Sequence, residues 1–500
     1  MKAIELILFV ILLSVSIVSA SQQLSGGVRI IANITTGGNP TIMIFNPLNG
    51  YVYALNPELG AINVINGTSL IMNITIERGT SVGLGNAVLD PRSGYMYVIL
   101  SAVPTNNTRV FIMSGTKVIS NVSLPGTASG ELLYDPRDGL IYVTSNKYGY
   151  VEESNGHESP AQVPLVGYIT VINGTRITAN ITTVPRVGYM LFDELNDFVY
   201  IADAGSNAVL VLNGTKVIAN MTTGIYPTYM VLDNHNGYVY VANSNPYIQG
   251  GHMLLGTVTA INGTRIVANM TVGSYPSYMI YDPGNNYVYV SNLYSDYVSI
   301  VNGTNVVANP ITGASPDALL YDPLNGYVYV GNVGSFAVRV NGSVTILSGT
   351  KVMANISAGS FPMPDLYDPA NGLIYVINAG SGLVTIMNGT RIAYTIVTGG
   401  FPSTALYDPY NHYVYVSNPK MGAINVLSPG TSRTNYASTT TTTTSTSITS
   451  ITTSTPTTPP YTSPPAIVKP TTLPIVVSTI IAVIIVAATT YLITRTRKRR

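Results

Sequence analysis

The sequence predicts an all-β fold, a single β-propeller of four-stranded blades, from three observations. One phrase, an Asp-Pro-like turn followed by tyrosines that alternate with aliphatic residues, occurs nine times, and its second tyrosines lie 40 to 58 residues apart. Tyrosine (36), glycine (46) and proline (31) are abundant while only 9% of residues are charged, which favours strands joined by tight turns. Four short strands per repeat are typical of a propeller blade.

One full repeat, residues 226–273, shows how the strands are predicted. Alternating apolar and aromatic residues predict strand A at 229–233, strand B at 238–243, strand C at 258–261 and strand D at 265–270. Asn262-Gly263 joins C to D, and we expect this pair to fill both central positions of a hairpin turn, where positive φ is required. All pairings are therefore expected to be antiparallel.

The ends of the repeat array predict that the ring closes. A solitary strand of type D, residues 28–35, precedes the first strand A, and the last repeat ends after a strand of type C at 423–427. The first strand can therefore complete the last blade and remove an open edge. Counting gives nine blades, more than the usual number of about four to eight. Two alternatives stay open: a degenerate early repeat packs outside a smaller ring, or the array divides in two.

The chain ends predict export and membrane anchoring. Residues 1–20 combine Lys2, an apolar run and Val18-Ser19-Ala20, the pattern of a cleaved secretory signal; an uncleaved anchor is the alternative. Residues 473–493 carry no charge, and as a helix they would reach about 31 Å, enough to cross a membrane. The basic tail at 494–500 is expected in the cytoplasm, which leaves residues 21–430 outside the cell as the propeller ectodomain.

Residues 431–472 predict a Ser/Thr/Pro-rich stalk between the ectodomain and the span. The tract includes six consecutive threonines at 439–444 and has too little apolar surface to fold. Its composition is that of O-glycosylated stalks, with an unmodified linker as the alternative. The expected localisation is the cell membrane, as a single-pass protein.

Composition excludes several kinds of site. The chain has no cysteine, which excludes disulfides, thiolate metal sites and a cysteine nucleophile. Its formal net charge is +1, and the predicted ectodomain is mildly acidic, so there is no basic footprint for nucleic acid. The four histidines show no zinc-type spacing. We therefore predict no cofactor, with Ca²⁺ bound to the loops as an alternative.

The end of strand B resembles a known family. Tyr-Val-Ala-Asn at 240–243, Tyr-Val-Ser-Asn at 289–292 and 415–418, and Tyr-Val-Gly-Asn at 329–332 resemble the repeat of the YVTN β-propeller family, found in archaeal surface-layer proteins. The resemblance covers about residues 28–428, and early repeats such as Tyr-Ala-Leu-Asn at 53–56 depart from it. It implies an archaeal cell-surface protein with a structural, adhesive or binding role. The family's lactonase-like and reductase-like relatives imply an enzymatic alternative.

Fifteen Asn-x-Ser/Thr sequons in the predicted ectodomain are candidate N-glycosylation sites, because export would bring them to the glycosylation machinery. They are Asn33, Asn66, Asn73, Asn106, Asn121, Asn173, Asn180, Asn213, Asn220, Asn262, Asn269, Asn302, Asn341, Asn355 and Asn388. Seven belong to Asn-Gly-Thr or Asn-Gly-Ser phrases, for which a purely structural turn is the alternative.

Propeller geometry predicts two unlike faces. The D–A and B–C loops share one face, and the A–B and C–D turns share the other. The long insertions at 147–167, 244–256 and 333–343 all interrupt B–C connections, so we expect the loop-rich face to bind a ligand. Candidate binding residues are Glu152, Glu153, His157, Glu158, Tyr226, Tyr275, Phe361 and Phe401. A solvated acidic loop and packing between blades are the alternatives for the acidic and the aromatic group.

No catalytic constellation is evident. An aspartate precedes the A–B turn in eight of nine repeats, with Asn46 in the other, and this regular recurrence indicates a structural role. The sequence predicts a membrane-anchored, glycosylated surface protein that serves as a coat, in adhesion or in binding surface proteins or carbohydrates. The alternative is an exported lactonase-like hydrolase. Two or more carboxylates around the central axis would favour the alternative.

Overall fold

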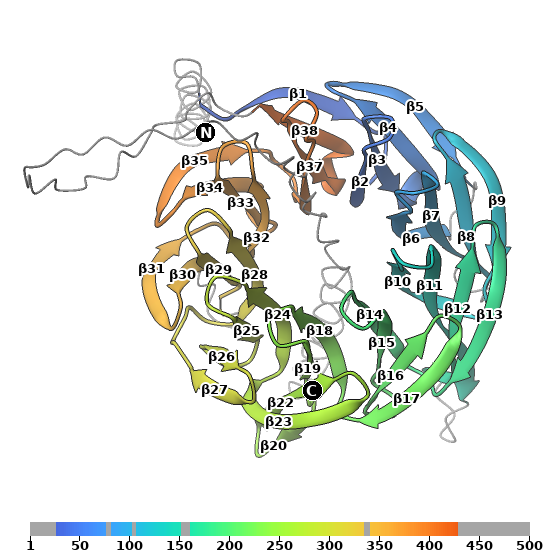
Figure 1. Ribbon diagram of the computed structural model, residues 1–500. Helices are drawn as coiled ribbons and strands as arrows, with labels where there is room; N and C mark the ends of the chain where they lie inside the picture. Colours follow the sequence, from blue (N-terminus) through green and yellow to red (C-terminus); the bar gives the residue numbers. More distant parts are fainter. Residues whose placement is uncertain (1–26, 77–81, 103–106, 152–160, 335–340, 429–500) are drawn as a thin grey trace, which may run out of the picture. The chain divides into compact units, whose positions relative to one another are not determined.

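A computed structural model describes residues 27–76, 82–102, 107–151, 161–334 and 341–428 of the chain. These residues form a ring of nine four-stranded antiparallel blades (Figure 1). The predicted single ring of nine is confirmed, and the alternatives of a smaller ring and of two arrays are wrong. Contacts divide the chain into two units, 1–431 and 432–500, and every described residue belongs to the first.

The predicted signal peptide, stalk, membrane span and basic tail lie outside the described residues. Within the described part, no helix is both long and apolar enough to cross a membrane.

Eight blades follow the chain in order, each written here from strand A to strand D. They are β2 (Ile42–Asn46), β3 (Tyr51–Asn56), β4 (Ala61–Asn66) and β5 (Ser69–Thr75); β6 (Val82–Leu89), β7 (Tyr95–Ala102), β8 (Asn107–Ser114) and β9 (Lys117–Ser123); β10 (Thr127–Tyr134), β11 (Leu140–Val151), β12 (Ala161–Asn173) and β13 (Arg176–Thr183); β14 (Val187–Asp193), β15 (Phe198–Asp203), β16 (Ala208–Asn213) and β17 (Lys216–Thr222); β18 (Pro227–Asp233), β19 (Tyr238–Asn243), β22 (Leu255–Asn262) and β23 (Arg265–Ser274); β24 (Pro276–Asp282), β25 (Tyr287–Asn292), β26 (Val298–Asn302) and β27 (Asn305–Ala308); β28 (Pro316–Asp322), β29 (Tyr327–Asn332), β30 (Ser343–Ser348) and β31 (Lys351–Ser357); and β32 (Pro362–Asp368), β33 (Leu373–Asn378), β34 (Leu383–Asn388) and β35 (Arg391–Val397).

The ninth blade joins the two ends of the array. It contains β36 (Thr404–Tyr407), β37 (Val414–Asn418), β38 (Ala423–Ser428) and, as strand D, β1 (Arg29–Thr35). Strand β1 pairs with β38 in antiparallel register from Arg29 opposite Ser428 to Thr35 opposite Ala423, which confirms the predicted closure. Two short 3-10 helices, η1 (Pro57–Leu59) and η2 (Pro419–Met421), each lie in a B–C connection.

Nine tyrosines, one on each strand B, are at most 1% exposed and lie at the interfaces between blades. Seven of their hydroxyls donate a hydrogen bond of 2.8–3.1 Å to the carbonyl of a C–D turn glycine in the next blade. Tyr415 of blade 9 reaches Gly67 of blade 1, so this contact also closes the ring. Tyr375 of blade 8 has no such partner because blade 9, completed by β1, has no C–D turn.

The asparagine that ends strand B in the family-like repeats is a structural residue. Asn378 is fully buried, and its Nδ2 donates to the Leu383 carbonyl at 3.3 Å and to Thr385 Oγ1 at 3.0 Å. Its Oδ1 accepts from the Gly359 backbone N–H at 2.9 Å. Because a buried amide must be hydrogen-bonded, this residue ties strand C and the D–A loop to strand B.

The structural role predicted for the residue before each A–B turn is also confirmed. In every blade the Asp, or Asn46 in blade 1, accepts a hydrogen bond of 2.8–2.9 Å from the backbone N–H two residues later. The side chain thereby holds the turn that joins strand A to strand B.

The prediction for the C–D hairpin is wrong in one respect. Asn262 pairs with Arg265, so the central residues are Gly263 and Thr264 rather than Asn262 and Gly263. Among the two, only the glycine has positive φ, at 58°. Ser114-Gly115-Thr116 forms the same turn in blade 2, with φ 55° at Gly115. The backbone therefore requires the glycine but not the asparagine before it.

Candidate functional site

The starts of the innermost strands carry an unusual set of side chains. Strand A of each blade lies nearest the axis, and neighbouring A strands are in contact (Figure 1). In seven blades the register between strands A and B shifts near the start of strand A, so that one to three residues lie outside the regular ladder. Glu131, Tyr189, Asp317 and Asp365 are among these residues. Such bulges re-aim side chains and are over-represented beside functional sites.

Six residues of strand A form what we call the axial mouth. They are Glu131, Tyr189, Tyr229, Tyr278, Asp317 and Asp365, on six consecutive blades. Tyr189, Tyr229, Tyr278 and Asp317 lie within the first three residues of their strands, near the D–A loops, and Glu131 and Asp365 lie near the middle of theirs. None of the six was predicted as a site residue from the sequence.

Three tyrosines of the axial mouth stack across blades 4, 5 and 6. The ring centroids of Tyr189 and Tyr229 are 4.4 Å apart, and those of Tyr229 and Tyr278 are 4.5 Å apart, with interplanar angles of 35° and 36°. Burial raises the pKa of all three hydroxyls above the ordinary value of 10. The stack is therefore uncharged at physiological pH. Tyr229, its middle ring, is only 6% exposed, so the partly exposed Tyr189 and Tyr278 supply the accessible aromatic surface.

Three carboxyl groups flank the tyrosines. Burial raises the pKa of Glu131 to about 7, and no other effect opposes it. Burial also raises the pKa of Asp365 to about 7, although this carboxylate accepts hydrogen bonds from the Ala405 backbone N–H and from Thr404 Oγ1. Burial raises the pKa of Asp317 as well, against a hydrogen bond from Ser277 Oγ at 3.0 Å that lowers it. The axial mouth therefore loses part of its negative charge below neutral pH, because Glu131 and Asp365 become protonated.

The axial mouth has no compensating positive charge on the strands that form it. The nine A strands contain no lysine, arginine or histidine. Glu131 and Asp317 keep part of their surface accessible although protein surrounds them. Asp365 is only 5% exposed, and its carboxylate is bonded to Thr404 and Ala405 of blade 9. Among the described residues, no three His, Cys, Asp or Glu side chains are close enough together to hold a metal ion. The arrangement suits a cationic organic group better than a single metal ion.

The predicted aromatic residues lie in the D–A loops above the axial mouth. Tyr226, Tyr275 and Phe361 have positive φ of 62°, 55° and 55°. Arg186 and Ser315 share this conformation at the same position in other blades, so it is a recurring feature of the D–A loop. Tyr275 packs edge to face on Tyr294, with ring centroids 5.4 Å apart. Burial raises the pKa of Tyr275 to about 12, and the nearby charge of Asp317 adds to this effect.

Phe401 is 48% exposed, with Lys420 Nζ 4.3 Å from its ring centroid. This cation–π contact holds Phe401 against the B–C connection of blade 9.

The other predicted binding residues, Glu152, Glu153, His157 and Glu158, lie outside the described residues. Two of the three insertions predicted to be loops contain strands instead. In blade 3 the strands β11 and β12 pair out to Val151 and Ala161, so much of 147–167 is an extended β-arm. In blade 5 the insertion contains a small hairpin of β20 (Ile248–Gln249) and β21 (His252–Met253). Strand pairing continues in both because main-chain groups on extended segments find partners there.

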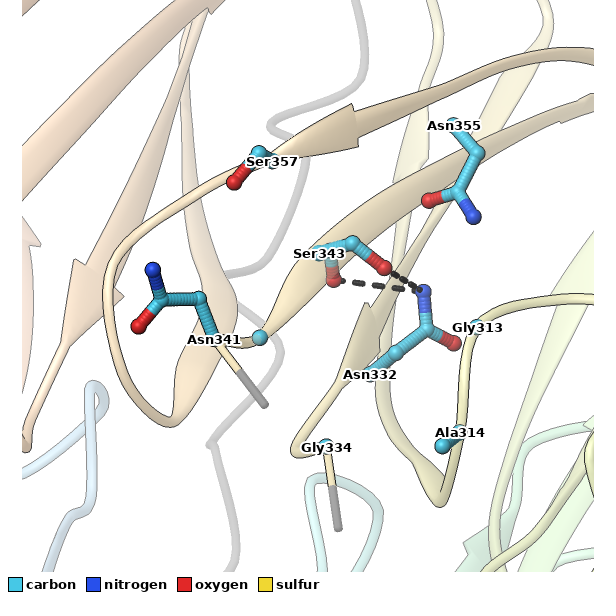
Figure 2. A pocket seen from close by; sticks show the side chains of 9 residues that line it. Gly313, Ala314, Asn332, Gly334, Asn341, Ser343, Asn355 and Ser357 are labelled. Atoms are coloured by element: carbon cyan, nitrogen blue, oxygen red, sulfur yellow. Dashed lines mark hydrogen bonds between the residues drawn. The ribbon is translucent and has the colours of Figure 1, made fainter. Parts of the chain in front are cut away.

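A small polar pocket of about 300 Å³ lies in blade 7 between its B–C connection and the preceding D–A loop (Figure 2). Asn332 is buried in its wall, and its Nδ2 donates to the backbone carbonyl and to Oγ of Ser343 at 3.2 and 3.1 Å. The lining residues carry no titratable group, and two of them, Asn341 and Asn355, are sequon asparagines. The pocket can offer hydrogen bonds but no acid–base chemistry.

Fourteen of the fifteen sequon asparagines are solvent-exposed, and Asn106 lies outside the described residues. Six occupy C–D turns, at Asn66, Asn173, Asn213, Asn262, Asn302 and Asn388. Seven lie on strand D, at Asn33, Asn73, Asn121, Asn180, Asn220, Asn269 and Asn355. Asn341 lies two residues before strand C of blade 7.

No protein-family model matches this chain, and no curated protein matches its sequence. Solved structures with a similar fold include BamB from Moraxella catarrhalis, at 12% identity over 80% of this chain and 97% of that chain, with a TM-score of 0.43. The hydrazine synthase of Kuenenia stuttgartiensis is 13% identical over 78% of this chain and 96% of that chain, with a TM-score of 0.40. The dihydro-heme d1 dehydrogenase NirN, in complex with DHE, is 15% identical with a TM-score of 0.39; the match covers 50% of this chain and 55% of NirN. The propeller assignment rests on the strand topology of this chain itself.

Proposed function

We propose that this chain is an exported, membrane-anchored and glycosylated cell-surface protein whose propeller binds a cationic organic ligand at the axial mouth. The observation that carries the binding role is the row of three stacked tyrosines flanked by three carboxyls, on A strands without a basic residue. Aromatic faces and carboxylates both attract organic cations. Because the carboxyls lie on separate blades, a ligand with several amino groups fits them best.

The surface location is supported by the chain ends and by the sequons. Residues 1–20 have the pattern of a secretory signal, and residues 473–493 that of a membrane span with a basic cytoplasmic flank. The exposure of fourteen sequon asparagines fits glycosylation. The resemblance to the YVTN family supports an archaeal surface-layer-like role, in which the loop-rich face also meets surface proteins or carbohydrates.

The binding role is tested by titrating full-length protein in detergent with spermidine at pH 8.0 and pH 5.5. Glu131 and Asp365 have pKa values of about 7, so most of their charge is lost at pH 5.5 and the affinity should fall at least tenfold. The triple variant E131Q/D317N/D365N should lose binding at pH 8.0, while the exposed control E58Q should not. Equal affinity of the triple variant, or tight binding of neutral glucose in place of spermidine, would contradict the proposal.

The three carboxyls of the axial mouth meet the condition, set from the sequence, that favours a second candidate, an exported propeller hydrolase. Carboxyls with pKa values near 7 are suited to general acid–base catalysis, and two of them lie in the axial mouth. This candidate predicts that the wild-type protein hydrolyses at least one member of a panel of lactones and esters, and that E131Q or D365N abolishes the activity. If the wild-type protein is inactive on the whole panel, the binding role is the only candidate that remains.

A further inference from the structure

The outermost strand of every blade leaves one edge unpaired. Strands β1, β5, β9, β13, β17, β23, β27, β31 and β35 are all terminal in their sheets. Such edges present free N–H and C=O groups to other chains and invite aggregation unless they are blunted. Exposed aliphatic side chains on these strands, 36–54% exposed, add to the hazard; they include Ile71, Ile119, Met353 and Val397.

The first half of each edge is blunted by the backbone itself. In all nine blades the pairing of strand D with strand C skips one residue, which forms a bulge. In blade 4 the skipped residue is Ile218, since Leu212 pairs with Val217 and Val211 with Ala219. A bulge twists an edge away from regular pairing. Beyond this bulge, in the second half of strand D, the pairing continues without another register shift in every blade except blade 5, where it shifts again between Thr271 and Ser274.

The strand-D sequons occupy this second half. In blade 4, Asn220 and Thr222 are exposed while Met221 between them is buried. The same alternation places the asparagine and the hydroxyl residue outward in all seven strands, with an aliphatic residue or methionine between them pointing inward. In blades 1 and 3 the Oδ1 atoms of Asn73 and Asn180 accept hydrogen bonds from strand C at 2.7 and 2.8 Å. These bonds leave Nδ2, the atom to which a glycan is joined, available.

The two strands without a sequon support the same interpretation in different ways. Blade 6 has Asn309-Pro310-Ile311, which is not a sequon because its third residue is neither Ser nor Thr, and β27 ends one residue earlier, at Ala308. Proline is itself a device that stops pairing along an edge. Blade 8 has Thr395-Ile396-Val397 at the corresponding positions and neither proline nor asparagine. The free edge of blade 8 is therefore the one that has the bulge but neither a sequon nor a proline.

We infer that N-linked glycans on the seven strand-D asparagines shield the free edges of the propeller from pairing with other chains. The inference rests on the glycosylation contained in the proposed function and assigns it a site and a role. At each site a bond forms between Nδ2 and the anomeric carbon of a lipid-linked oligosaccharide. The bond from that carbon to the lipid phosphate breaks, the lipid phosphate leaves, and the amide gives up one proton. The hairpin sequon asparagines are the last residues of strand C and pair with the first residue of strand D, so they lie at the end of a blade and not along its free edge.

The test compares two sets of substitutions that remove acceptor hydroxyls and keep every asparagine, in full-length protein produced in the native host. One variant has alanine at Thr35, Thr75, Ser123, Thr182, Thr222, Thr271 and Ser357, on strand D. The matched control has alanine at Thr68, Thr175, Thr215, Thr264, Thr304 and Thr390, in the C–D turns. Glycopeptide mass mapping of wild-type protein establishes which sites are occupied, and light scattering in detergent measures association.

We expect glycans on strand D in the wild type, and at least a fivefold larger aggregated fraction in the strand-D variant than in the control. Removal of glycans from folded wild-type protein with a glycosidase should raise aggregation likewise, which covers the case in which the variant fails to fold. Absence of glycan from every sequon would overturn the glycosylation in the proposed function and the inference with it. Occupied strand-D sites with no difference in aggregation would overturn the shielding role alone.

Discussion

Tyr329 and Tyr375 occupy the same position in neighbouring blades and differ by one hydrogen bond. Replacing each with phenylalanine therefore isolates the contribution of the hydrogen bond from the tyrosine hydroxyl to the next blade. Both side chains are fully buried. The Tyr329 hydroxyl donates to the Gly389 carbonyl at 2.9 Å, whereas the Tyr375 hydroxyl has no partner within the described ranges. Y329F loses a hydrogen bond with a net value of about 0.5–1.5 kcal/mol. Y375F removes a buried hydroxyl that is desolvated without compensation, so it should be neutral or up to about 1 kcal/mol more stable.

The assay is denaturant unfolding of wild type, Y329F and Y375F in the same detergent, followed by circular dichroism. The expected order of midpoints is Y375F at or above wild type and Y329F below it, with about 1–2 kcal/mol between the two variants. Equal losses in the two variants, or a larger loss in Y375F, would refute the idea that the hydroxyl links adjacent blades.

Three further predictions concern the axial mouth, a D–A loop and the closure. The pKa of Glu131 rises from 4.5 to about 7 on folding, so the folded protein binds an extra proton between these values and its stability falls as pH rises through this window. E131Q lacks this fall and should exceed wild type by about 1–3 kcal/mol at pH 8 but not at pH 4, as measured by chemical unfolding at both pH values; identical pH profiles would count against the burial of this carboxyl. A Cβ at Gly224 would overlap Thr257 Oγ1 and lie 2.8 Å from Asn243 Cβ, so G224A should cost about 1–3 kcal/mol, whereas G188A, which meets nothing within 4 Å, should be neutral in the same unfolding assay. Deletion of residues 29–35 leaves β38 unpaired on one side and should convert the protein into aggregates on size-exclusion chromatography; an intact monomeric peak would argue against closure by β1.

The fold could be predicted from the sequence because its information is local and repeated. Each repeat carries its own strand alternation and its own turn residues, such as the aspartate whose carboxylate accepts from the backbone two residues later. The unpaired first strand at 28–35 and the missing last strand D together identified the closure. The prediction that Asn262 and Gly263 are the central residues of the C–D turn was wrong because the sequence does not show where strand pairing ends.

The axial mouth could not be predicted from the recurring phrase because its residues differ from blade to blade. Glu131, Tyr229 and Asp365 occupy nearby positions in strand A, where the repeat has no fixed residue. Register shifts decide which of these side chains leave the ladder, and such shifts depend on pairing with strand B. A usable signal was present nonetheless. Alignment of the nine A strands on the turn aspartate shows three successive tyrosines and three isolated carboxyls in otherwise apolar strands.

The claim that this propeller is exported and glycosylated is tested most directly by the intact mass of the protein isolated from its native host. Cleavage after Ala20 followed by N-glycosylation predicts a heterogeneous set of masses, all above that of the polypeptide that begins at Ser21. Digestion to peptides should then place part of the excess on strand-D asparagines. A single mass equal to the bare polypeptide from Ser21 would contradict glycosylation, and a mass that includes residues 1–20 would contradict cleavage of the signal.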